Sequence, residues 1–211
     1  MRKKEQIWVT VLRILLAGVF IFSGFSKAID PVAAAIQFDD YFTSFGMGFL
    51  HPISLFCALG MTTLEFMIGF TLLCKLKVKL ASLGYLLIMI FMFCLTGWLA
   101  LAEHLEITYG YNFGVVKDCG CFGEVIKMTN MATFLKNIPL LIGGIIIFRK
   151  RKSIPDIRLT ELGQWIIIGI VIIALSLFQL YCYRNLPVFD TGDWKKGANI
   201  KETFIDRKSV V

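Results

Sequence analysis

The sequence predicts an all-α integral membrane protein with five transmembrane helices and a short external tail. Two features of the composition indicate this class. The first is the high content of hydrophobic residues, 57%, of which many are aromatic, 14% of the chain; the second is the mean hydropathy of +0.73. Both lie far from the averages of soluble domains. The third observation is that the apolar residues are gathered into stretches long enough to cross a bilayer as helices, which takes roughly 17 to 25 residues.

Five such stretches are predicted to span the membrane. They cover residues 7–28, 52–74, 80–102, 131–148 and 163–183. The fourth is the shortest. Its helix is expected to extend back toward Thr129 or Asn130, because either side chain can accept a hydrogen bond from a free backbone N–H as an N-cap.

The basic residues predict the orientation of the chain. Short basic segments come before the first span, between the second and third, and after the fourth, so all three fall on one side of a five-span protein. By the positive-inside rule that side is cytoplasmic. In a bacterial inner membrane the N-terminus is then cytoplasmic, and residues 103–130 and the tail of residues 184–211 face the periplasm. Because topology explains much of the net charge of +7, we expect no nucleic-acid binding.

The loop of residues 30–51 is predicted to contain a short helix at the outer membrane surface. Pro31 suits the first turn of a helix, and aromatic residues follow that suit the headgroup region. These are Phe38, Tyr41, Phe42 and Phe45. Interfacial anchoring is the preferred interpretation, with the additional expectation that such a helix could cap a cavity between the spans.

Two cysteines one residue apart, Cys119 and Cys121, stand in the longest polar loop. Residues at this spacing reach disulfide distance only in a bent backbone, which Gly120 permits. The resulting ring is strained, and a strained, exposed disulfide exchanges readily with thiolates. Lys117 would favour a neighbouring thiolate and Asp118 would oppose it, so either sulfur could be the nucleophile. We predict that the pair is redox-active.

Three other interpretations of the cysteine pair stay open. It could be a structural bridge, a pair of idle thiols, or a metal clip completed by His104. A dithiol without further ligands nearby makes a poor closed metal site. Redox exchange is therefore preferred, and no metal is expected.

Ionisable residues inside the spans are the second signal, because a charge near the bilayer centre costs about 2.5 to 3.5 kcal/mol on insertion scales. Glu65 lies well inside the second span, and Arg13 lies at a similar but shallower depth in the first. We expect an ion pair between them. Alternatively, Arg13 extends to the cytoplasmic surface, and Glu65 is protonated and bonded to Thr62, Thr63 or a backbone carbonyl. Glu65 could also serve proton movement or contact a quinone oxygen.

Two further cysteines are candidates for a relay. Cys57 and Cys182 lie near the outer ends of the second and fifth spans, whereas Cys74 lies near the cytoplasmic surface and Cys94 lies deep in the third span. A relay from the loop to a membrane acceptor needs an exchangeable cysteine close to the first pair. The opposing interpretation is that single cysteines in apolar helices are small packing residues.

Several motifs between residues 7 and 149 fit one group of membrane proteins. They are Arg13 with Gly18, Ser23-Gly24 followed by Lys27 and Asp30-Pro31, Glu65 with Gly69, and Asp118-Cys119-Gly120-Cys121-Phe122-Gly123. With these motifs the chain resembles the DoxX and methylamine-utilisation MauE group of small bacterial membrane proteins. The resemblance implies a four-helix membrane bundle that forms or passes disulfides in periplasmic proteins; in the methylamine case the implied client is a disulfide-rich dehydrogenase subunit. The fifth span and the tail extend beyond this pattern.

We therefore expect a membrane thiol-disulfide oxidoreductase, or a redox partner in such a system, that acts on periplasmic thioredoxin-like or client proteins. A client thiolate would attack one sulfur of the pair, and the client's second cysteine would resolve the mixed disulfide. A lipid quinone between the outer ends of the helices is a reasonable acceptor, although no quinone-binding signature can be read from the residues. The main alternative is a non-catalytic scaffold or assembly factor with a structural disulfide, and metal handling or solute transport is a third.

Overall fold

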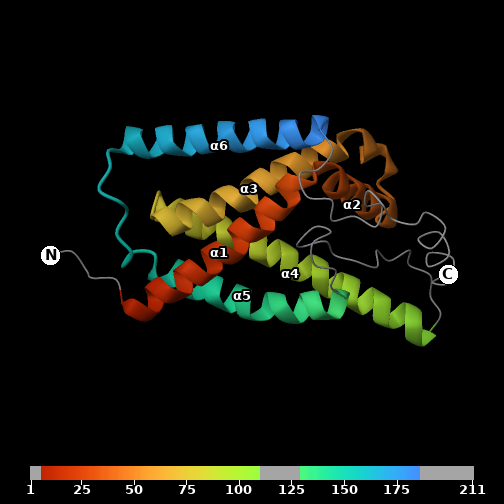
Figure 1. The fold of residues 1–211 in the computed structure, drawn as a ribbon. Coiled ribbons are helices and arrows are strands. Elements are labelled where there is room, and N and C mark those ends of the chain that lie inside the picture. The colour runs from red at the N-terminus through yellow and green to blue at the C-terminus, as the bar shows by residue number, and fades with distance from the viewer. Residues whose placement is uncertain (1–5, 110–128, 186–211) are drawn as a thin grey trace, which may run out of the picture.

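The computed structural model describes residues 6–109 and 129–185 (Figure 1). Within these residues the chain forms six α-helices, one short 3-10 helix and no strands. Five of the helices are long and apolar enough to cross a membrane, which confirms the all-helical, five-span prediction at this level. The elements are α1 Ile7–Ile29, α2 Pro31–Ser44, η1 Gly48–Ile53, α3 Ser54–Cys74, α4 Val78–Tyr109, α5 Asn130–Lys150 and α6 Glu161–Arg184.

The predicted spans agree with the observed helices to within a few residues, with α4 as the exception. The prediction ended the third span at residue 102 and assigned residues 103–109 to the loop, whereas α4 continues to Tyr109. The predicted start of the loop is therefore wrong. Hydropathy marks where the apolar stretch ends, but a helix makes its backbone hydrogen bonds internally and so need not end there.

Short polar residues begin two helices where the sequence suggested. The carboxylate of Asp30 accepts a hydrogen bond from the Ala33 N–H at 3.0 Å, and Pro31 occupies the first turn of α2. The hydroxyl of Thr129 accepts from the Ala132 N–H at 3.3 Å at the start of α5. The predicted short helix after the first span and the predicted N-cap at Thr129 are both confirmed.

One end of the bundle, which we call the basic end, gathers the start of α1, the α3–α4 turn and the α5–α6 connection (Figure 1). The Ile157 N–H donates to the Lys75 carbonyl at 3.0 Å. The ammonium of Lys150 lies 5.9 Å from the ring centroid of Trp8. Two of the three basic segments therefore share this end; the first, residues 2–4, lies outside the described residues.

The opposite end, which we call the distal end, carries α2, the end of α4 at Tyr109 and the start of α5 next to Thr129 (Figure 1). Residues 110–128 and the tail of residues 186–211 lie outside the described residues. Five predicted site residues fall in the first of these gaps and also lie outside: Lys117, Asp118, Cys119, Gly120 and Cys121.

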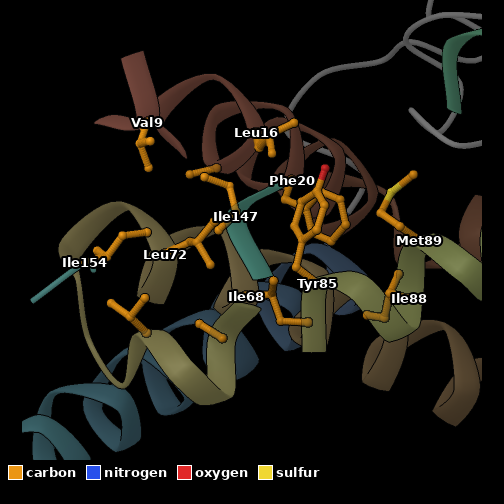
Figure 2. Close-up of a cluster of buried hydrophobic side chains, with 13 residues drawn as sticks. Val9, Leu16, Phe20, Ile68, Leu72, Tyr85, Ile88, Met89, Ile147 and Ile154 are labelled. Carbon is orange, nitrogen blue, oxygen red and sulfur yellow. The ribbon is translucent and has the colours of Figure 1, made fainter. Parts of the chain in front are cut away.

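The hydrophobic core lies where α1, α3, α4 and α5 meet (Figure 2). At its centre the rings of Phe20 and Tyr85 pack with their centroids 4.3 Å apart. The Tyr85 hydroxyl donates to the Leu140 carbonyl at 3.4 Å, which links α4 to α5. The ring of Tyr85 fits against α5 because residue 144 is glycine: a Cβ there would lie 2.7 Å from the ring.

Helix α6 packs on α1, α2 and α3 and is the least buried of the long helices. Only 17% of its most apolar 18-residue stretch is buried inside the protein, against 39% of the corresponding stretch of α1. Two buried glutamines hold it: Gln164 accepts from the Lys77 N–H at 3.1 Å, and Gln179 donates to the Thr63 hydroxyl at 3.1 Å. Most of its apolar surface is thus left to contact lipid.

Helices α1 and α3 cross at close range because two glycines lie in the contact. A Cβ on Gly24 would lie 2.7 Å from the backbone nitrogen of Phe66, and a Cβ on Gly69 would lie 2.8 Å from the carbonyl oxygen of Ala17. Both distances are shorter than real Cβ contacts allow. Small residues commonly permit such close approach between membrane helices.

Replacing Gly24 with alanine should therefore destabilise the protein by about 1 to 3 kcal/mol, since the added methyl overpacks a backbone contact. Gly18→Ala on the same helix is the matched control, because a Cβ there meets no atom within 4 Å. That control should be neutral or stabilising by up to about 1 kcal/mol. Unfolding of the purified variants in detergent, followed by circular dichroism, measures both; equal effects would contradict the close crossing.

Candidate functional site

Glu65 lies buried in α3 with two partners from α1. Its side chain is 7% exposed and that of Lys27 is 12% exposed. The Lys27 ammonium lies 2.9 Å from Oε1 and 2.7 Å from Oε2 of the carboxylate. The Ser23 hydroxyl donates to Oε2 at 3.0 Å. We call Ser23, Lys27 and Glu65 the Lys–Glu cluster.

The spacing along α1 explains how the cluster forms. Ser23 and Lys27 are four residues apart, so their side chains lie one above the other on one helix face. That face meets α3 at the glycine crossing, which brings Glu65 within reach of both. The ammonium and the hydroxyl compensate the cost of removing a carboxylate from water, as a buried ion pair requires.

The expected ion pair between Arg13 and Glu65 is wrong. Nη1 of Arg13 donates instead to the carbonyls of Leu72 and Leu73, at 2.6 and 2.9 Å. These carbonyls belong to the last turn of α3, whose carbonyls have no partner within the helix. The alternative of an arginine extended to the surface is also wrong, because Arg13 is only 3% exposed.

Sequence reasoning missed Lys27 as the partner of Glu65. Counting residues from the membrane surface compares depth, and by depth Arg13 looked suitable. Depth does not determine which face of a helix meets its neighbour. The usable signal was the spacing of Ser23 and Lys27, two polar side chains on one face in the last two turns of α1.

A cavity of about 600 Å³, which we call the α2 pocket, lies between α2, α3 and α4 and reaches Lys27 of α1. The expectation that the short helix could cap a cavity between the spans is confirmed. The walls are mainly aromatic and apolar. The lining residues with charged, thiol or aromatic groups include Lys27, Phe38, Tyr41, Phe42, Cys57 and Phe91.

Two contacts, one at the start of α2 and one further along it, hold this helix over the pocket. Its first turn is capped by Asp30. Further along, Oδ1 of Asp39 lies 2.9 Å from Nδ1 of His51 in η1. The hydrogen bond from His51 holds the pKa of the Asp39 carboxyl below its usual range, whereas partial burial and the neighbouring Asp39 raise the pKa of Asp40.

A second, small cavity of about 40 Å³ lies on the other side of the Lys–Glu cluster. Ser23 and Glu65 line it together with Lys136 and Asn137 of α5. The other lining residues are apolar, and the size of the cavity suits a water molecule. Glu65 therefore lines this small cavity, whereas its partner Lys27 lines the aromatic α2 pocket.

The two relay candidates lie in different surroundings. Cys57 is half-buried and lines the α2 pocket. Cys182 is 3% exposed within α6. Neither is in a disulfide, and a relay role for either stays a prediction.

No group of three or more metal-ligating side chains is found in residues 6–109 and 129–185. The metal clip considered above would involve Cys119 and Cys121, which lie outside those residues.

The profile of a family described as methylamine utilisation protein MauE matches residues 5–149. The chain belongs to the MauE family. The MauE match contains α1 to α4 and nearly all of α5, and with them the Lys–Glu cluster, the α2 pocket and the cysteine pair. The match thus confirms the resemblance to MauE, whereas it says nothing about a resemblance to DoxX. Helix α6 and the tail lie beyond the MauE region.

Protein TlpB of Flavobacterium psychrophilum, a curated relative, is 26% identical over 198 residues. The alignment covers 92% of this chain and 49% of TlpB, so the chain spans about half the length of the curated relative it matches. Because so little of this chain lies outside the alignment, the aligned region includes α6. No solved structure matches the chain significantly.

Removing one partner of the Lys–Glu cluster should be costly. Lys27→Met leaves a buried carboxylate without its ammonium, and we expect a loss of about 3 to 5 kcal/mol in the free energy of unfolding. The double variant Lys27→Met with Glu65→Met should recover most of this loss, since no buried charge remains. Unfolding in detergent measures all variants.

Lys79→Met is the matched control, because Lys79 is exposed at the start of α4. It should change the free energy of unfolding by no more than about 0.5 kcal/mol. A double variant no more stable than Lys27→Met alone would show that the two charges do not depend on each other.

Proposed function

We propose that this protein is a membrane thiol-disulfide oxidoreductase, or a redox partner in such a system, that forms or relays disulfides through Cys119 and Cys121. One observation supports this most: the chain that contains the pair connects Tyr109 of α4 to Thr129 of α5, and both residues lie at the distal end. The α2 pocket, with Cys57 in its wall, is formed beneath α2 at that end as well. A thiol pair is thereby tethered to the half of the bundle that carries a ligand-sized cavity.

The reaction is an exchange of bonds between sulfurs. A thiolate of the partner attacks one sulfur of the Cys119–Cys121 disulfide and a mixed disulfide forms. The partner's second thiolate then attacks that bond, so the partner leaves oxidised and the cysteine pair leaves as a dithiol. Two electrons pass from the partner to this protein, and the reverse direction uses the same steps.

The proposed orientation follows the charges. The basic end faces the cytoplasm of a bacterial cell and the distal end faces the periplasm, where disulfides form and persist. In this arrangement α1, α3, α4 and α5 form the four-helix unit implied by the DoxX and MauE resemblance. Helix α6 is a fifth, added span, and residues 184–211 form an external tail.

The partner is proposed to be a thioredoxin-like or disulfide-containing periplasmic protein. The name of the MauE family refers to methylamine utilisation, and the resemblance implies a disulfide-rich client. TlpB is about twice as long as the region it shares with this chain. The membrane unit is thus joined to a further segment there, which fits a unit that works together with another domain.

The reduction potential of the cysteine pair tests the proposal. Detergent-purified protein is equilibrated in graded thiol buffers, and the thiols are alkylated and assigned by mass spectrometry. We expect a potential above about −300 mV, since strained and exposed disulfides are more oxidising than structural ones. Cys119→Ser and Cys121→Ser should each be compared, and one of them should trap a mixed disulfide with a thioredoxin-like protein.

Cys94→Ser is the matched control for trapping, because Cys94 lies on α4 and does not line the α2 pocket. It should trap no partner. A far more negative potential, with no trapped partner in either single-cysteine variant, would contradict an oxidoreductase and favour a scaffold with a structural disulfide.

A further inference from the structure

We infer that the cavity between α3, α4 and α6, which we call the α6 groove, binds an anionic phospholipid. Its phosphate lies at Lys77 and its acyl chains lie along the groove. This inference goes beyond the proposed function, because it concerns how the bundle holds lipid near its basic end and does not involve the cysteine pair. The α6 groove is lined only by described residues.

The α6 groove exists because α6 packs beside α3 and not against α4 (Figure 1). Helix α3 contacts both neighbours, whereas no Cα atoms of α4 and α6, which are described throughout, lie within 8 Å of each other. The space between them has a volume of about 890 Å³, within the range of roughly 300 to 1,000 Å³ that is usual for small-molecule sites. Its walls include Leu80 of α4, which is 56% exposed, and Trp165 of α6, which is 50% exposed. In a membrane the groove is therefore open to the surrounding lipid.

The walls of the groove offer mainly hydrocarbon surface. Two polar groups of the wall form their hydrogen bonds inside the protein: the Thr71 hydroxyl donates to the Met67 carbonyl at 2.7 Å, and the Gln179 amide donates to the Thr63 hydroxyl at 3.1 Å. Acyl chains suit such walls, because they are apolar and carry no hydrogen-bonding groups of their own. The aliphatic lining residues include Leu59, Leu76, Leu80, Ile168 and Ile172.

Lys77 supplies a cation where the groove meets the basic end. It lies in the α3–α4 turn and lines the groove. Its ammonium is 3.1 Å from Oε1 of Glu161, whose side chain is 89% exposed. An ion pair with so exposed a carboxylate contributes little stability, and an ammonium has three N–H donors. Lys77 can therefore bind a phosphate beside Glu161 or in its place.

The charges around Lys77 favour an anion. Lys75 and Lys79 flank it in the sequence. The carboxylates near this turn are Glu161 and Asp156, and Asp156 is engaged through Oδ1, which accepts from the first N–H of α4 at 2.9 Å. Three lysines thus face two carboxylates. Clusters of basic residues at a membrane surface attract anionic headgroups.

The position of Trp165 indicates how the lipid lies. The Lys77 ammonium is 5.4 Å from the centroid of the Trp165 ring, and tryptophan is enriched at the level of the headgroups. Ile168 and Ile172 follow Trp165 by three and seven residues, so all three lie on one face of α6 and line the groove. A lipid with its phosphate at Lys77 therefore places its chains along this face.

The affinities for two lipids test the inference. Full-length protein in detergent is titrated with phosphatidylglycerol, or with zwitterionic phosphatidylcholine as the comparison, and native mass spectrometry measures the lipid-bound fraction. Phosphatidylglycerol should bind about fivefold more tightly, which is the effect of one lysine near an anionic headgroup. Glycerol 3-phosphate, which carries the phosphate without the chains, should not displace it at equal concentration.

Charge variants test the headgroup site. Lys77→Met should lower the affinity for phosphatidylglycerol about fivefold and that for phosphatidylcholine by less than about twofold, whereas Lys77→Arg should keep the preference. Glu161→Gln should raise the affinity for phosphatidylglycerol roughly twofold, because a competing carboxylate is removed. A misfolded variant would not show this gain. Lys152→Met is the matched control, since Lys152 is exposed just after α5 and does not line the groove; it should change neither affinity.

A second pair of variants tests the chain site. Ile168→Trp should weaken the binding of both lipids about tenfold or more, because the larger side chain fills the groove. Ile170→Trp makes the same change two residues further along α6. Ile170 is 61% exposed and lines neither the groove nor the α2 pocket, so this control should bind both lipids like the unaltered protein.

Four outcomes would overturn the inference. The first is equal affinity of the unaltered protein for the two lipids. The second is an equal loss in Lys77→Met and Lys152→Met, which would assign the preference to the charge of the whole basic end. The third is full binding in Ile168→Trp. The fourth, visible in the same mass spectra, is a dimer that binds no lipid and is lost in Ile168→Trp, which would assign the groove to a second copy of this chain.

Discussion

A carboxylate inside a membrane helix must be neutralised by a partner, and the pairing of Glu65 with Lys27 is the interaction on which the membrane part depends. An unpaired charge there would cost several kcal/mol. Helices α1 and α3 must therefore approach closely at one height and one rotation. Gly24 and Gly69 permit that approach. Once α1 and α3 are fixed, α2 follows directly from α1 and is brought over α3, which creates the α2 pocket next to the charged pair.

The fold was predictable from the sequence where the information is local. The length of an apolar stretch reports whether it can cross a bilayer, so α1, α3, α5 and α6 were predicted to within a few residues. Pro31 and Thr129 marked helix starts for reasons that involve only neighbouring backbone groups. The end of α4 was not predictable from hydropathy, because a helix can continue into water once the apolar stretch has ended.

The candidate site was less predictable, because pairing depends on how helices rotate against each other. Glu65 was identified because a charged side chain inside a membrane has a high free-energy cost. The partner assigned to it, however, was Arg13 and not Lys27. The actual role of Arg13 is to donate to the last carbonyls of α3 near the basic end. The buried Arg13 and the partly buried Lys27 thus act at different heights of one helix pair. Cys119 and Cys121 were identified from their spacing, which is a covalent constraint and needs no knowledge of the fold.

The unexpected length of α4 has a consequence for access by other proteins. Residues 103–109 continue the helix past the predicted apolar stretch by about 10 Å, at 1.5 Å per residue. The C-terminal end of α4, at Tyr109, therefore lies beyond the predicted apolar stretch of this helix. The connection to α5 therefore starts from the end of a helix that continues past the predicted apolar stretch, and not at the end of that stretch. A folded, water-soluble protein would thus reach the start of this connection beyond the apolar part of the helix.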